Sequence, residues 1–153
     1  MQTLAQTVKI NCCTGDFPLI TTKKARIPAL RLARGKVAMI ASRAGRTGYA
    51  ALNASPSGTK AHYAASKAAL LSLVKSLAIE LAPDGVRVNA IVPGSIEGNM
   101  IPQERWPELA ARIPLGRLGT PDEIADAVRY LCSDEARYIT GHAMDVNGGT
   151  WMS

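Results

Sequence analysis

Residues 61–94 have the sequence AHYAASKAALLSLVKSLAIELAPDGVRVNAIVPG, which joins a long helix to a buried strand. Apolar side chains recur at helical spacing in its first part, and Pro83 and Gly85 end the helix that we predict over residues 60–81. The next run is short, continuous and rich in valine, as in a strand buried on both faces, and it stops at Pro93-Gly94. This order of elements is typical of α/β proteins.

The same alternation of helix and strand continues on both sides of this segment. The patterns predict strands over residues 37–41, 86–92 and 143–146 and further helices over residues 102–112 and 121–133. The last helix has a clear start signal, because Thr120 can cap it and Glu123 completes a capping box. Residues 1–35 give only a weak helical pattern. We therefore expect one domain over residues 1–153 with a parallel, incomplete sheet.

Composition and charge exclude several classes of protein. The chain has 153 residues, 47% hydrophobic and 20% charged, as in an ordinary globular protein. It has no apolar run of the ~18 residues that a membrane span needs, and its polar start indicates a cytoplasmic protein. The net charge of +6 comes from scattered basic residues without interleaved aromatics, so we expect no nucleic-acid partner. Three cysteines and two histidines without a ligand spacing predict no metal site.

Tyr63 and Lys67 are the candidates for chemistry on the predicted helix. Their spacing of four places both side chains on one face, in line with a stripe of leucine and valine. A free tyrosine ionises near pH ~10, and a nearby ammonium favours the phenolate, so the pair suits acid–base catalysis. On the motif alone, the simpler interpretation is a lysine that extends to solvent beside a packed tyrosine.

Five blocks of the chain, in order, resemble the short-chain dehydrogenase/reductase family. They are MIASRAG (39–45), AHYAASKAAL (61–70), GVRVNAIVPGSI (85–96), GRLGTPDEIA (116–125), and YITG with DVNGG (138–141 and 145–149). The resemblance covers about residues 8–152 and is closest to the classical branch that includes the 3-oxoacyl-carrier-protein reductases. It implies an α/β fold, the C-terminal half of a Rossmann-type doubly wound parallel sheet.

The resemblance also implies a function and its residues. The chain would be an NAD(P)-dependent oxidoreductase that moves a hydride between a nicotinamide and a carbonyl or secondary alcohol. Tyr63 would be the acid and base, Lys67 would favour its phenolate and hold the nicotinamide ribose, and Ser42 would bind the substrate oxygen. Asn11 would hold a water in a proton relay. The residues that would line the nicotinamide are Pro93, Gly94 and Ile96. Two alternative roles stay open, in which Ser42 is a turn residue and Asn11 is a helix cap.

Some features depart from the family pattern. No G-x-G-x-x-G phosphate-binding loop occurs, so the first βαβ unit is missing from the expected sheet. The resemblance implies NAD or NADP as the cofactor, with NADPH slightly favoured, and we expect the isolated chain to bind it weakly or not at all. Ser42 and Tyr63 are 21 residues apart, which is wider than usual for the family, and Gly98 stands where a threonine is common. A truncated, non-catalytic remnant that binds a partner, or is merely folded, is the alternative function.

The substrate would be a small-molecule or acyl-carrier-bound carbonyl compound. We also predict a homodimer or homotetramer through the Tyr63–Leu81 helix, because the helix has a second apolar side besides the stripe that faces the sheet. That side contains Ala64, Ala68, Leu71 and Ile79. A helix that is apolar on two sides needs two partners, and a two-fold axis would supply the second.

Overall fold

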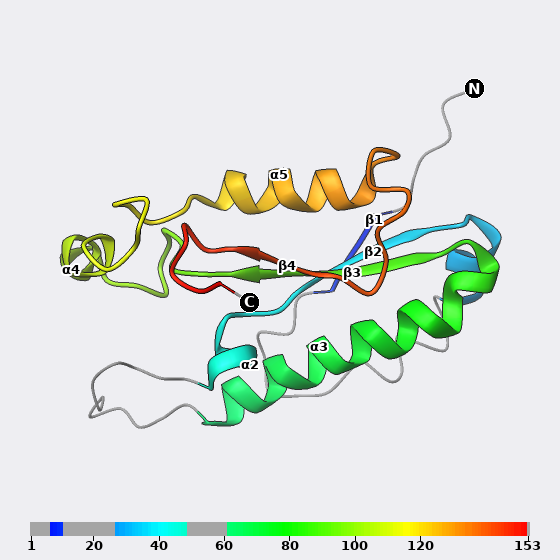
Figure 1. The fold of residues 1–153 in the computed structure, drawn as a ribbon, viewed down its shortest axis with the longest axis horizontal. Helices are drawn as coiled ribbons and strands as arrows, with labels where there is room; N and C mark the ends of the chain where they lie inside the picture. Colours follow the sequence, from blue (N-terminus) through cyan, green and yellow to red (C-terminus); the bar gives the residue numbers. More distant parts are fainter. Residues whose placement is uncertain (1–6, 11–26, 49–60, 153) are drawn as a thin grey trace.

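A computed structural model of the chain describes residues 7–10, 27–48 and 61–152 (Figure 1). Four parallel strands form one sheet in the order of the chain. They are β1 (Thr7–Ile10), β2 (Lys36–Ile40), β3 (Arg87–Pro93) and β4 (Ala143–Val146). Three of these strands were predicted from the sequence, and their parallel pairing confirms the α/β class.

Strand β1 shows that the helical pattern predicted for residues 1–35 is wrong at Thr7–Ile10. This segment pairs with β2 from Thr7 opposite Lys36 to Ile10 opposite Met39. Three of its four residues are β-branched, which favours a strand. Four residues are too few to display a period, so the pattern alone could not separate strand from helix. Residues 27–32 are helical, as expected.

Helices cover both faces of the sheet, as in a doubly wound fold. Figure 1 shows α3 (Ala61–Leu81) on one side of the strands and α5 (Pro121–Cys132) on the other. Alternate strand residues contribute to two separate cores. The core under α3 includes Val37, Met39, Val88, Ala90 and Val92 with Leu70, Val74, Leu77 and Leu81. The core under α5 consists of Ala38 and Ile91 with Val128 and Leu131. This alternation explains why the predicted strands look apolar throughout.

The shorter helices differ from prediction in two places. The helix expected over residues 102–112 is divided into η2 (Gln103–Arg105) and α4 (Trp106–Ala110). Pro107 has no N–H to donate to the preceding turn, so a single helix through this position would lose a hydrogen bond. The second difference is α2 (Ala44–Thr47), because the glycine, serine and proline content of residues 43–60 predicts a loop there. The remaining element, η1 (Ala82–Asp84), ends the long helix. No helix in the described ranges is long and apolar enough to cross a membrane.

The outward face of α3 is less apolar than predicted. Ala64 is buried, so it does not belong to the second apolar side. It lies in the part of α3 nearest to α2, and these two helices are in contact. Ala68 and Ile79 are exposed and Leu71 is partly buried, so the second side is reduced to these three residues.

The predicted capping box at the start of α5 is confirmed. The Thr120 side chain accepts a hydrogen bond from the Glu123 N–H at 3.3 Å, and the Glu123 carboxylate accepts one from the Thr120 N–H at 2.8 Å. Arg117 donates two further hydrogen bonds to this carboxylate, at 2.9 and 2.6 Å. These hydrogen bonds lower the pKa of Glu123 to about 2, with the largest effect from Arg117 and the next from Thr120.

This lowered pKa predicts a pH-dependent contribution to stability. An unfolded glutamate ionises near pH ~4.3, so the Glu123 contacts stabilise the fold fully above about pH 5 and are lost as the pH falls toward about 2. The melting temperature of wild type should therefore exceed that of Glu123→Gln at neutral pH, and the difference should shrink on acidification. Circular dichroism at several pH values measures both, with Glu104→Gln as the control. Parallel acid profiles for wild type and Glu123→Gln would contradict the assignment.

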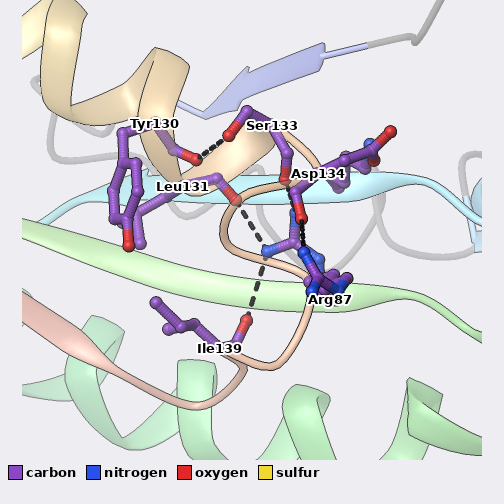
Figure 2. Close-up of polar contacts among 8 residues, drawn as sticks. Arg87, Tyr130, Leu131, Ser133, Asp134 and Ile139 are labelled. Atoms are coloured by element: carbon purple, nitrogen blue, oxygen red, sulfur yellow. Dashed lines mark hydrogen bonds and ion pairs between the residues drawn. The ribbon is translucent and has the colours of Figure 1, made fainter.

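The C-terminal end of α5 is held by Arg87 at the start of β3. Figure 2 shows the guanidinium among main-chain carbonyls, with hydrogen bonds to Leu131 at 2.7 Å, Ser133 at 2.8 Å and Ile139 at 3.2 Å. The last carbonyls of a helix have no partner within the helix, and a cation there also suits the helix dipole. Arg87 thus fixes the turn that leads from α5 into β4.

Candidate functional site

Most of the predicted site residues gather at one edge of the sheet. Ser42 follows the carboxyl end of β2, and Pro93 is the last residue of β3. Tyr63 lies in the first turn of α3, and Figure 1 shows this turn beside α2, at the same edge as the ends of β3 and β4. In open α/β sheets, ligands bind in the crevice outside the carboxyl ends of the strands.

Lys67 is the most unusual residue of this edge. It is only 2% exposed, and its Nζ donates a hydrogen bond to the main-chain oxygen of Ile40, at 2.9 Å. The same Nζ lies 5.6 Å from the centre of the Tyr63 ring. Within the described ranges, no carboxylate forms an ion pair with it. The simpler interpretation of the motif is therefore wrong, because this lysine does not extend to solvent.

Among the described residues, only the main-chain oxygen of Ile40 accepts a hydrogen bond from the buried ammonium. A lysine ammonium carries three N–H donors, and Ile40 occupies one of them. A buried charge is costly unless its donors are satisfied, so the arrangement favours a polar ligand with hydroxyl or anionic oxygens. The Tyr63 ring beside it is partly exposed and accessible to the same ligand.

Ser42 lies in a turn that is tied to two strands. Its Oγ accepts a hydrogen bond from the Ala44 N–H at 3.2 Å, which leaves its own hydroxyl proton available to donate. The Arg43 N–H donates to the main-chain oxygen of Pro93 at 3.2 Å, and this bond joins the turn to the end of β3. Ser42 is partly buried at this position.

Gly45 also belongs to the site, although it was not predicted as a site residue from the MIASRAG block (39–45) that contains it. A Cβ added to it would lie 2.6 Å from the carbonyl carbon of Lys67 and 2.8 Å from the nitrogen of Ala68. The backbone of α2 therefore rests directly on the turn of α3 that carries Lys67. A glycine three residues after a strand-end serine was the available signal.

We predict that Gly45→Ala destabilises the fold by ~1–3 kcal/mol, since overpacking against backbone outweighs the ~1 kcal/mol that alanine gains in a helix. Urea denaturation measures the change. Gly35→Ala is the matched control, because its added methyl would also have a nearest neighbour at 2.6 Å, but that neighbour is the mobile Cδ2 of Leu30. Equal losses in the two variants would show that contact with the Lys67 backbone is not the cause.

The turn after β3 is equally close-packed. A Cβ on Gly94 would lie 2.8 Å from both Cα and Cβ of Asn147, so only glycine fits there. Ile96 forms a β-bridge with Gly119, but the hydrogen bonds of this bridge belong to the residues on either side of Ile96. The Gly119 N–H donates to the main-chain oxygen of Ser95, and the Glu97 N–H donates to that of Gly119. The N–H and C=O of Ile96 itself bond to no other group in the described part of the chain.

Asn11, the remaining predicted site residue, lies outside the described residues. Ser42 and Pro93 lie at strand ends, Tyr63 and Lys67 lie in the first turns of α3, and Gly94 and Ile96 follow the end of β3. In the described ranges, no group of three or more side chains could hold a metal ion.

Comparison with known proteins identifies the family of the chain. The family model described as enoyl-(acyl carrier protein) reductase matches residues 6–150. The chain belongs to the short-chain dehydrogenase/reductase family. A solved member from Brucella melitensis, a glucose/ribitol dehydrogenase by description, superposes with a TM-score of 0.69 at 37% identity, over 78% of this chain and 46% of its own.

Other similar proteins are 3-oxoacyl-[acyl-carrier-protein] reductases by description. The 3-oxoacyl-[acyl-carrier-protein] reductase of Aquifex aeolicus is 40% identical over 147 residues, which are 94% of this chain and 55% of that protein. The Escherichia coli reductase of the same description is 48% identical over 98 residues, 62% of this chain and 40% of its own. A Brucella melitensis reductase of this kind, solved with bound NAD, has a TM-score of 0.73 and 38% identity, over 88% and 48% of the two chains. The chain thus spans about half the length of these relatives.

Proposed function

We propose that this chain carries the catalytic residues of an NAD(P)-dependent oxidoreductase that interconverts a carbonyl compound and a secondary alcohol. The substrate class is a 3-oxoacyl group on an acyl carrier or a small-molecule analogue, as the names of the relatives suggest. The observation that carries the proposal is Lys67, whose buried ammonium lies beside Tyr63 and has N–H donors that no described residue accepts.

The residues of this edge fit the nicotinamide end of the cofactor. Lys67 offers donors for ribose hydroxyls, and the N–H and C=O of Ile96 are available to the two ends of a carboxamide. Gly94 lets the turn between them pack directly against Asn147, which fixes the position of that turn. When bound, the cofactor supplies the hydride.

The protein residues would handle the proton and the charge. During reduction the Tyr63 hydroxyl gives its proton to the substrate oxygen, and in the reverse direction the phenolate accepts it. The Lys67 ammonium places a positive charge 5.6 Å from the centre of the Tyr63 ring. Ser42 donates its hydroxyl proton in a hydrogen bond to the same substrate oxygen, where negative charge develops.

Nicotinamide mononucleotide tests this assignment, because it contains the part of the cofactor that these residues would contact. Titration followed by amide NMR should shift the signals of Gly94, Ser95 and Ile96 in a saturable way. Lys67→Met should weaken the binding at least ~10-fold, the equivalent of ~1.4 kcal/mol. The control is Lys75→Met, an exposed lysine on the same helix. Unchanged binding by Lys67→Met would refute the ribose assignment, and no saturable shift at all would favour the non-catalytic alternative.

NADH and NADPH titrated in parallel address the choice of cofactor and the strength of dinucleotide binding. We expect weak binding of both by this chain, because the residues above contact only the nicotinamide and its ribose. A micromolar dissociation constant for NADPH would show that another surface holds the phosphates.

We infer that α3 also mediates self-association, as a two-fold pair of helices. Ile79 is 79% exposed on this helix, and Ala68 and Leu71 lie on the same side. Light scattering should give a dimer or larger species at high micromolar concentration, and Ile79→Lys should shift it toward monomer because a charge would enter the contact. A monomer in the unmodified protein would contradict the inference.

A further inference from the structure

The short helix α2 connects the elements that carry the candidate site. It follows Ser42 directly, and the Arg43 N–H preceding it bonds to Pro93 at the end of β3. On one side Gly45 packs against the backbone of Lys67. A displacement of α2 would therefore move Ser42 relative to Lys67.

Arg46 ties the other side of α2 to β4. Its Nη2 donates a hydrogen bond to the main-chain oxygen of Ala143 at 2.7 Å and lies 3.4 Å from Oδ2 of Asp145. Asp145 is opposite Val92 in the β3–β4 register, so the contact crosses β3 just before the Pro93-Gly94 turn. It links two segments that are distant in sequence but adjacent at the site.

The burial of this ion pair distinguishes it from those at the surface. The side chains of Arg46 and Asp145 are 23% and 18% exposed, whereas those of Arg129 and Asp126 are 75% and 63% exposed. Exposed pairs contribute little because solvent screens them, and a pair withdrawn from water holds its geometry more firmly. The planar guanidinium holds its N–H donors in fixed directions, so it can contact a carbonyl and a carboxylate at once. A lysine ammonium is a point charge on a flexible chain and does not fix the two partners in this way.

We propose that Arg46 and Asp145 are positioning residues that hold α2, and through it the Ser42 hydroxyl, in place for the reaction. The proposal rests on the proposed function, in which Ser42 binds the substrate oxygen. Neither side chain needs to touch the substrate. Arg46 acts on Ser42 through the backbone of a four-residue helix, and Asp145 acts by orienting Arg46.

The Ala44 amide reports the position of the Ser42 hydroxyl, because its N–H donates to Ser42 Oγ at 3.2 Å. Its NMR chemical shift depends on that hydrogen bond in the folded protein and is unaffected by a loss of global stability. Ser42→Ala removes the acceptor and gives the reference shift for a broken bond. This signal therefore separates a positioning role from a purely stabilising one.

The test compares Arg46→Met with wild type, Ser42→Ala and the surface control Arg129→Met. We expect the Ala44 signal of Arg46→Met to move at least halfway toward that of Ser42→Ala, with Asp145→Asn moving it in the same direction. Arg46→Lys should recover part of the shift. For reduction of acetoacetyl-coenzyme A by NADPH, kcat should fall at least tenfold in Arg46→Met with a smaller change in KM, and Arg129→Met should match wild type in both readouts.

An Ala44 signal that stays at the wild-type position in both Arg46→Met and Asp145→Asn would overturn the proposal. An equal shift in Arg129→Met would do the same. If Arg46→Met does not fold, Asp145→Asn decides alone, because it keeps the size of the side chain while it removes the charge and replaces one acceptor oxygen with an amide nitrogen. A shift of Ala44 in a protein without turnover supports the positioning role and counts against the proposed activity. Turnover that depends on Tyr63 but not on Arg46, with Ala44 unmoved, refutes the positioning role alone.

Discussion

Tyr63→Phe should lower kcat for the reduction of acetoacetyl-coenzyme A by NADPH by ~10²–10⁴-fold, the usual contribution of a positioned proton donor. The substitution removes one hydroxyl and keeps the ring that lies 5.6 Å from the Lys67 Nζ. Binding of nicotinamide mononucleotide should therefore change little, because Lys67, Gly94 and Ile96 remain in place. The measurement is steady-state kinetics followed by the absorbance of NADPH.

Tyr138→Phe is the matched control for this prediction. It makes the same chemical change at a tyrosine that is 100% exposed and distant in sequence from every candidate site residue. We expect its kcat and KM to equal those of wild type. Comparable losses in the two variants would show that Tyr63 has no specific role. Turnover retained by Tyr63→Phe within a factor of three would exclude it as the proton donor.

The part of the fold that has strong local signals could be predicted from the sequence. The long helix, its stop before Gly85 and the capping box of Thr120 and Glu123 each depend on residues close together in the chain. Local rules of helix spacing and capping are sufficient for these features. The alignment of Tyr63 with Lys67 has the same origin, because a spacing of four fixes both on one face.

The features that could not be predicted depend on tertiary contacts. Strand β1 is stabilised by its pairing with β2, and its four residues are too few to show the alternation that is typical of a strand. Ala64 is buried because α2 packs near the start of α3, which no helical projection includes. The close approach of Gly45 to Lys67 and the pairing of Arg46 with Asp145 join segments from different parts of the chain. The sequence thus indicated the candidate site residues but not the contacts that α2 makes with the elements around them.

Lys67→Met should increase the stability of the fold while it weakens nicotinamide mononucleotide binding. Withdrawing an ammonium from water costs several kcal/mol. The hydrogen bond to Ile40 returns ~1.5–3 kcal/mol and the contact with the Tyr63 ring ~0.5–1 kcal/mol, so the lysine is a net cost to folding. Methionine has a similar length and no charge, and we expect it to raise the free energy of unfolding by ~1–2 kcal/mol.

Urea denaturation of wild type, Lys67→Met and Lys75→Met measures this effect. The midpoint should rise for Lys67→Met without a change in slope, and it should stay within ~0.5 kcal/mol of wild type for the exposed Lys75. A buried ammonium that lowers stability is typical of functional sites, where activity is gained at the expense of stability. A loss of more than ~1 kcal/mol in Lys67→Met would instead make Lys67 a structural residue, because the bond to Ile40 would then outweigh the cost of burial.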